Sequence, residues 1–176
     1  GAFSFSDLSP ARTPQVALVS PLPTAHPKWV PPLRSSTRRQ LEYATGYLTL
    51  NLKTEAAEAL DEIDPADRDL TPVMALRAAV HCELAEWAFA TPLLAVLCER
   101  EPGAPGHWVQ AAYATRRHLG IAPAREILRR GLALHPHEAS IHFNLACYAA
   151  QLGELDAARL HLDAACKLDA AFVALS

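Results

Sequence analysis

A repeat of 34 residues that begins at Thr37 is the feature that most constrains this chain. When the sequence is written in rows of 34 that start at residues 37, 71, 105 and 139, three columns hold one residue type each. The eighth column is alanine in every row: Ala44, Ala78, Ala112 and Ala146. The twentieth column is also alanine: Ala56, Ala90, Ala124 and Ala158. The twenty-fourth column is leucine: Leu60, Leu94, Leu128 and Leu162. A fixed period of this length is typical of helical repeat arrays.

The three invariant columns are those that closely packed helices require. Small residues at a helix crossing let two backbones approach, and a larger apolar residue one turn along fills the adjacent space. Alanine and leucine also have high helix propensity, and hydrophobic residues make up 51% of the chain. A single hairpin would leave one apolar face open, so we expect stacking of successive hairpins to form the core.

The repeat resembles the tetratricopeptide repeat (TPR). The fourth row is the best match, with Asn144-Leu145-Ala146 on its first helix and Gly153-Glu154-Leu155 at its turn. The third row carries Trp108 at the family's tryptophan position and closes with Leu134-His135-Pro136. The resemblance implies an all-α fold, a right-handed alpha-alpha superhelix of four helical hairpins. The expected repeats span about 37–70, 71–104, 105–138 and 139–172, within a TPR domain of residues 37–176.

Two departures from the repeat pattern lead to local predictions. Pro92 falls where the second helix of repeat two should begin, with Thr91 before it as an N-cap. We therefore expect that helix to start three or four residues late and the first helix to extend past Trp87. Gly120 lies one residue after the column of the turn glycine, which predicts a turn shifted by one residue in repeat three. Asn51 and Ala85 stand at that column in the first two repeats.

The TPR resemblance assigns a concave face to the first helices of the hairpins. We use this name for the surface that carries ten candidate partner-binding residues: Leu41, Thr45, Leu48, Ala79, Val109, Tyr113, Arg116, Arg117, Phe143 and Cys147. The stripe is apolar with a basic step at Arg116 and Arg117, so it suits an extended peptide with apolar side chains and one carboxylate. The alternative is that these residues only pack between neighbouring first helices.

One subgroup of the family binds the acidic C-termini of chaperones through a clamp of lysines and asparagines. At the corresponding positions this chain has Leu41, Thr45, Leu76, Gly106 and Gln110. Because none of these is lysine or asparagine, the sequence argues against a chaperone-tail adaptor.

Residues 1–36 differ from the repeats and are expected to form an extended proline-rich arm. Seven of the 14 prolines lie here, and that density excludes a long helix and favours polyproline-II backbone. Three basic residues against Asp7 give the arm a charge of +2, whereas the remaining 13 basic and 18 acidic residues give −5. The arm also carries apolar segments at 16–19 and 29–33, so we expect it to pack on its own repeats, in the groove or as a cap, or on a second copy.

No sequence pattern indicates catalysis, and we expect neither an enzyme nor a bound metal or cofactor. His135, His137 and His142 lack the supporting cysteine or carboxylate spacing of a metal site. His81 and Cys82 are adjacent on a helix, so they do not face each other as a thiol–base pair would. The net charge of −3 gives no basic stripe for nucleic acid, and no apolar run is long enough to span a membrane.

The sequence therefore predicts a non-enzymatic scaffold that binds a protein or an extended peptide. Self-association, for example as a homodimer, is a second hypothesis, because the apolar segment 170–176 must either fold back or be covered by a partner. A secretion-type chaperone is a third, by analogy of size and repeat number only. We expect a cytoplasmic location, or a periplasmic one if an upstream signal peptide has been removed.

Overall fold

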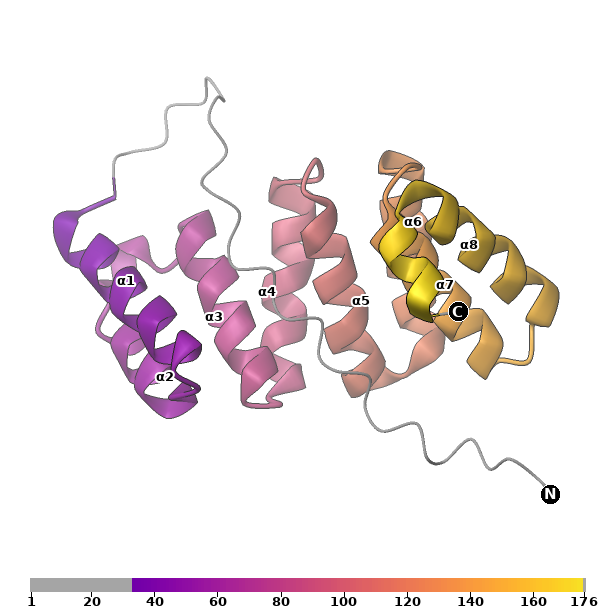
Figure 1. Cartoon of the computed structure of the whole chain (residues 1–176). Helices are drawn as coiled ribbons and strands as arrows, with labels where there is room; N and C mark the ends of the chain where they lie inside the picture. The colour runs from indigo at the N-terminus through magenta and orange to yellow at the C-terminus, as the bar shows by residue number, and fades with distance from the viewer. Residues whose placement is uncertain (1–32, 176) are drawn as a thin grey trace. The chain divides into compact units, whose positions relative to one another are not determined.

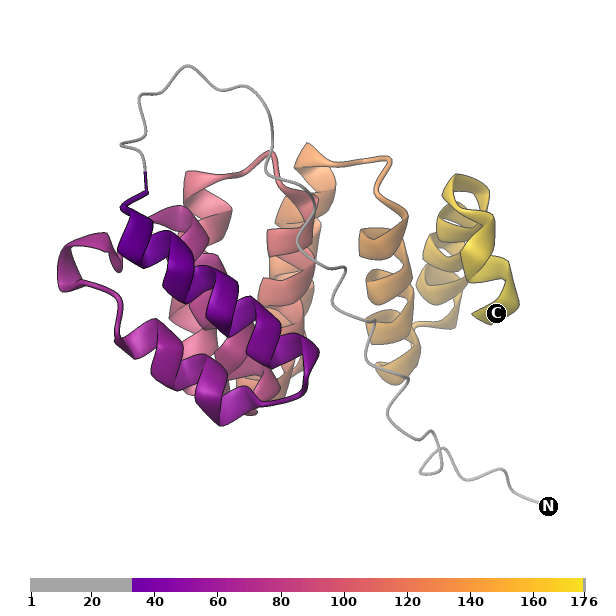
Figure 2. The ribbon, with the colours of Figure 1, turned by 60° about the vertical axis from the view of Figure 1, so that its left-hand side comes forward.

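The computed structural model describes residues 33–175, which form eight α-helices and two short 3₁₀-helices. The helices are α1 Ser35–Thr49, α2 Lys53–Asp61, α3 Thr71–Glu83, α4 Trp87–Arg100, α5 Pro105–Leu119, α6 Ile121–Leu134, α7 Ala139–Gln151 and α8 Leu155–Leu168. The 3₁₀-helices are η2 Pro65–Asp67 and η3 Ala170–Leu175. The helices follow one another as a stack of hairpins (Figures 1 and 2), which confirms the all-α repeat fold. The proline-rich segment 1–32 lies outside the described residues.

The hairpins keep the 34-residue register closely. The second helix of each hairpin begins at the seventeenth column, at Lys53, Trp87, Ile121 and Leu155. Helices α3, α5 and α7 begin at the first column, and α1 begins two residues earlier. Each first helix contacts its own second helix, and α1 also contacts α3 as α5 contacts α7. The first helices of repeats one and two, and those of repeats three and four, are therefore neighbours.

Burial of the invariant columns confirms their role in packing. In the first three repeats the column-20 alanines and the column-24 leucines are almost completely buried. In repeat four, Ala158 and Leu162 are only half-buried. The difference arises because no later hairpin covers α8 within the described residues.

The core is divided into two clusters, and α3 contributes to both. We call one the N-terminal cluster: Ala44, Ala56, Ala59, Leu60, Ile63, Val73, Leu76 and Val80. The C-terminal cluster takes Met74 and Ala78 from α3 and continues through α4–α7. The two sets of α3 residues lie on different sides of that helix because an α-helix turns about 100° per residue.

The late start expected for the second helix of repeat two is wrong. Helix α4 begins at Trp87, α3 ends at Glu83, and Pro92 lies inside α4. Proline in a helix interior costs about 3 kcal/mol, because it removes a backbone donor and crowds the preceding turn. An on-register start places both Ala90 and Leu94 in the core, where they are fully buried. That packing outweighs the local preference of proline for a helix start.

The turn of repeat three is shifted by one residue, as the position of Gly120 predicts. In the other three repeats a left-handed residue occupies the fifteenth column: Asn51 with φ 60°, Ala85 with φ 58° and Gly153 with φ 78°. In repeat three α5 runs through that column, and the positive φ of 99° falls on Gly120. Helix α6 still begins at the seventeenth column, so this hairpin is joined by a single residue.

Ala85 is expected to be a strained position, because a left-handed backbone brings its Cβ too close to the following carbonyl. Ala85→Gly should therefore raise the free energy of unfolding by about 0.5–1 kcal/mol, measured by urea denaturation. The same change in regular helix, Ala164→Gly, should lower it by a similar amount. A destabilising Ala85→Gly would contradict the strain.

His142 on α7 and His161 on α8 face each other, with 3.1 Å between their Nδ1 atoms. Burial, His142 and Arg129 together lower the pKa of His161, so its charged form is disfavoured in the folded state. The contribution of neutral His161 to the free energy of unfolding is present above about pH 6.5, the pKa of histidine in the unfolded chain. It is lost as the pH falls below that value. We expect the melting temperature to fall between pH 7.5 and pH 5.5, and to fall less in His161→Asn. The exposed His137→Asn serves as the control, and equal slopes in both variants would refute the assignment.

Candidate functional site

All ten residues of the predicted concave face lie on the first helices of the hairpins, and none is fully buried. Helix α1 carries Leu41, Thr45 and Leu48, and α3 carries Ala79. Helix α5 carries Val109, Tyr113, Arg116 and Arg117, and α7 carries Phe143 and Cys147. The residues share one set of helices, but the contacts they make divide them into distinct groups.

The residues of α1 are mainly engaged in packing. Leu41 and Leu48 lie against the N-terminal cluster. The Thr45 hydroxyl donates a hydrogen bond of 2.7 Å to the Leu41 carbonyl within the same helix. Leu41 and Leu48 therefore fit the alternative stated above, in which the predicted binding residues serve to pack the helices together.

The centre of the face contains aromatic rings and arginines in direct contact. The ring of Tyr113 meets that of Trp87 edge to face, with 5.6 Å between the ring centroids. The guanidinium carbon of Arg117 lies 5.4 Å from the centroid of the Trp87 ring, within the range of a cation–π interaction. We call Trp87, Tyr113 and Arg117 the aromatic–arginine cluster.

Arg116 is held toward the next repeat. Its guanidinium lies 5.6 Å from the ring centroid of Tyr148 and donates a hydrogen bond of 2.8 Å to the Gln151 side chain. Burial raises the pKa of Tyr148 to about 12, although the Arg116 charge acts in the opposite direction. Arg116 therefore points along α7, whereas Arg117 points toward α4.

Neither arginine is neutralised by a carboxylate of the described residues. Among residues 33–175, the ion pairs do not include Arg116 or Arg117. His118 follows them at the exposed end of α5. An arginine that no carboxylate neutralises keeps its positive charge available for an external carboxylate.

The C-terminal part of the face is partly covered by the chain itself. Helix η3 folds back so that the Phe172 ring lies 4.9 Å from the Phe143 ring, measured between centroids. Burial raises the pKa of the neighbouring Cys147 thiol, although the charge of Arg116 acts in the opposite direction. The fold-back of segment 170–175 is the first of the two alternatives that the sequence left open.

The sequence missed Trp87, Tyr148 and Gln151 as part of this site. Trp87 begins a second helix, so a rule restricted to first helices passes over it. Tyr148 lies in the tenth column, one column after that of Cys147, which the resemblance does not assign to the concave face, and its ring becomes relevant only because α5 and α7 are in contact. A signal was available in the seventeenth column: Lys53, at the same column as Trp87, also contacts the next first helix, through an ion pair with Glu83.

The remaining cysteines and histidines of residues 33–175 form no comparable group. All four cysteines are unpaired, and Cys98 is the most buried of them. His135 hydrogen-bonds to the Pro102 carbonyl at 2.8 Å, whereas His142 is paired with His161. The three histidines singled out in the sequence therefore do not converge. No helix within residues 33–175 is both long and apolar enough to cross a lipid bilayer.

No protein-family model and no curated protein matches the chain. Solved structures do match it. MamA from Desulfovibrio magneticus RS-1 aligns with a TM-score of 0.70 at 14% identity, over 77% of this chain and 76% of that one. MamA of strain AMB-1 aligns with a TM-score of 0.63 at 21% identity, over 74% and 76%. A thermophilic TPR protein from Thermus thermophilus aligns with a TM-score of 0.63 at 18% identity, over 76% and 74%.

Proposed function

We propose that this chain, which has the TPR fold, is a non-enzymatic scaffold that binds an extended peptide or a partner protein on its concave face. The single observation that carries the proposal is the aromatic–arginine cluster next to Arg116. It combines ring surfaces with two guanidinium groups that no carboxylate of residues 33–175 neutralises. Aromatic residues and arginine are the types that contribute most to binding at protein interfaces.

The cluster indicates the chemistry of the ligand. Half-buried Val109 and Ala79 provide apolar surface beside Tyr113, and Arg116 and Arg117 supply positive charge at the end of α5. An extended segment with apolar side chains and one acidic group would satisfy both features. The acidic group would pair with the guanidinium of Arg116 or Arg117, and each of these already lies against an aromatic ring. Because the ring restricts the arginine side chain before binding, little conformational entropy would be lost on binding.

The arm of residues 1–36 is a second source for such a segment. It is proline-rich with apolar segments, and α1 begins at Ser35 within its last residues, so docking on the repeats would have a high effective concentration. Deleting residues 1–32 should then strengthen binding of an external peptide. Unchanged peptide affinity and an unchanged melting temperature would remove the arm from the proposal.

We expect Arg116→Glu and Tyr113→Ala each to lower the affinity for a captured partner at least tenfold, because each removes a central contact of the concave face. The measurement is affinity capture from the source cell followed by titration of the purified partner. Arg129→Glu on α6 is the matched control, since Arg129 is exposed and lies on a second helix. If both variants keep every partner that the wild-type chain captures, the concave face is not the binding surface.

Self-association remains a second candidate because α8 exposes large apolar side chains. Leu155 and Leu160 are 70% and 69% exposed, on a helix that no further hairpin covers among the described residues. Light scattering over a wide concentration range tests this candidate. A strict monomer at high concentration would leave the scaffold as the only proposal.

A further inference from the structure

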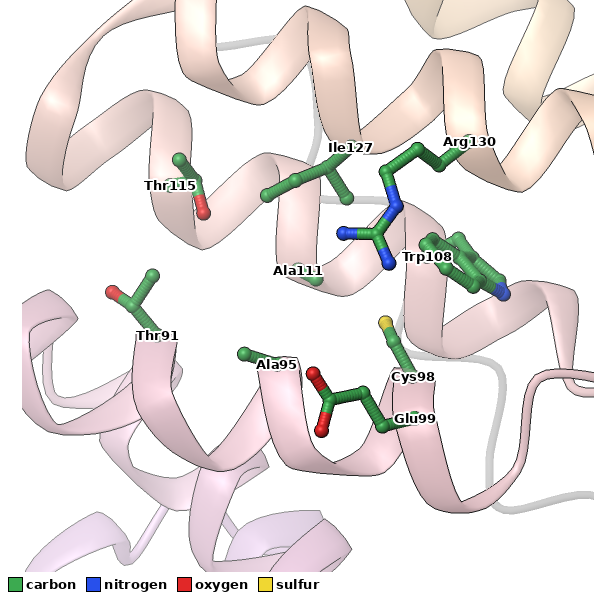
Figure 3. Close-up of a pocket in the computed structure, with 9 residues that line it drawn as sticks. All are labelled: Thr91, Ala95, Cys98, Glu99, Trp108, Ala111, Thr115, Ile127 and Arg130. Atoms are coloured by element: carbon green, nitrogen blue, oxygen red, sulfur yellow. The ribbon is translucent and has the colours of Figure 1, made fainter.

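A cavity of about 90 Å³ lies between α4, α5 and α6, away from the concave face (Figure 3). Its middle is lined by Ala95, Ala111 and Ile127, and Thr91 and Thr115 line one end. At the other end Arg130 and Glu99 project toward the gap from opposite helices (Figure 3). None of the ten concave-face residues lines it.

The repeat register shows which side chains stand at this junction and at the equivalent ones. Column 25 of one repeat meets column 7 of the next, and at the first junction these are Asp61 and Arg77, which form an ion pair. At the third junction they are Arg129 and the buried Leu145. At the second junction both are alanines, Ala95 and Ala111. A smaller cavity of about 50 Å³ lies beside Asp61 and Arg77 at the first junction, and the cavity beside the two alanines is the larger of the two.

The cavity also holds a polar group that the described residues do not satisfy. Thr115 is 2% exposed, and its hydroxyl has no hydrogen-bond partner among residues 33–175. A buried hydroxyl without a partner costs about 1–3 kcal/mol. Across the gap, the Thr91 hydroxyl donates to the Trp87 carbonyl, so its oxygen lone pairs remain able to accept. One end of the cavity thus offers a free donor and a free acceptor, next to a middle that is lined by apolar side chains.

We propose that this cavity is a second binding site, which takes one glutamine side chain of a partner protein. The two methylene groups would lie between Ala95 and Ala111, and the amide would lie between the threonines. Thr115 would donate to the amide oxygen, and Thr91 would accept from the amide nitrogen. Arg130 and Glu99 would contact the partner's backbone at the mouth.

The size of the cavity argues for a side chain over a whole small molecule. Pockets that enclose a ligand usually measure about 300–1,000 Å³, and a cavity that holds benzene measures about 150 Å³. A space of about 90 Å³ that opens to the surface accommodates a few heavy atoms. The rest of the occupant must remain outside, as it does when a side chain projects from a polypeptide.

Propionamide, which reproduces the glutamine side chain, is the probe. NMR titration of the full chain should give saturable shifts at the methyl groups of Ala95, Thr115 and Ile127. Ala111→Leu, which introduces the residue of the equivalent column in repeat four, should weaken binding at least tenfold and raise the melting temperature. Thr115→Val keeps the shape but removes the hydroxyl, and should weaken binding about fivefold.

Two results would overturn the proposal. The first is a titration without saturation, which would mean that water alone occupies the cavity. The second is equal propionamide affinity in the wild type, Ala111→Leu and Thr115→Val. Tyr113→Ala should leave propionamide binding unchanged, so failure of this site and failure of the concave face are distinguishable.

Discussion

Replacing Trp108 with alanine is expected to lower the free energy of unfolding by about 3–5 kcal/mol. Trp108 is 3% exposed and lies in the C-terminal cluster, and its indole nitrogen donates a 3.1 Å hydrogen bond to the Pro102 carbonyl. Gly131 of α6 packs so closely on it that an added Cβ would lie 2.8 Å from the Trp108 Cβ. Because the surrounding helices are fixed by the repeat, they cannot collapse into the space that the indole leaves. Urea denaturation monitored by circular dichroism measures the loss.

Two further variants separate burial from other effects of losing an aromatic residue. Trp108→Phe keeps a ring in the core but removes the hydrogen bond to Pro102, so about 1–2 kcal/mol should be lost. Phe89→Ala removes a side chain that is 62% exposed and should change stability by about 0.5 kcal/mol or less. A loss below about 1 kcal/mol for Trp108→Ala would mean that the stack repacks around the site.

The second large effect is expected from Thr37→Val, which should cost about 1.5–3 kcal/mol. Thr37 at the start of α1 is buried, and its hydroxyl donates to the carboxylate of Asp67 in η2. Asp67 is 6% exposed, and its carboxylate also forms an ion pair with Arg34, with 3.4 Å between Nε and Oδ1. Valine has the same shape but no donor, so a buried carboxylate would lose its strongest hydrogen bond.

The control for this prediction is Thr49→Val at the other end of α1. The Thr49 hydroxyl is exposed and donates only to the Thr45 carbonyl in its own helix. Its removal should change the free energy of unfolding by about 0.5 kcal/mol or less. Equal effects of the two substitutions, measured by the same denaturation experiment, would show that the Thr37–Asp67 contact contributes little.

The sequence predicted the fold well because the same column pattern occurs in all four repeats. Ala90 and Leu94 hold their columns although Pro92 lies between them, and this regularity fixes where α4 begins. The error at Pro92 came from giving a local helix-start preference more weight than the register. The shift of the turn to Gly120 was predictable because glycine adopts a positive φ more readily than other residues, and the turn between two helices requires one.

The candidate site was less predictable. Column rules placed Tyr113 and Arg117 on the correct helix, but the contact with Trp87 depends on how far each hairpin rotates against the next. The cavity depends on a pair of positions in different columns, Ala95 and Ala111, which become neighbours only when two repeats stack. Features that arise between repeats therefore require the structure.

The division of the core at α3 has a consequence for cooperativity. Within the described chain, no buried residue of α1 or α2 belongs to the C-terminal cluster. Helix α3 alone contributes buried residues to both clusters. Opening of the first hairpin would therefore uncover one side of α3 and leave the packing around Trp108 intact. Amide protons of α1 and α2 should exchange with solvent through a subglobal opening at lower free energy than those of α5 and α6. The aromatic–arginine cluster would persist in that partly open state, so ligand capture and complete folding need not be coupled.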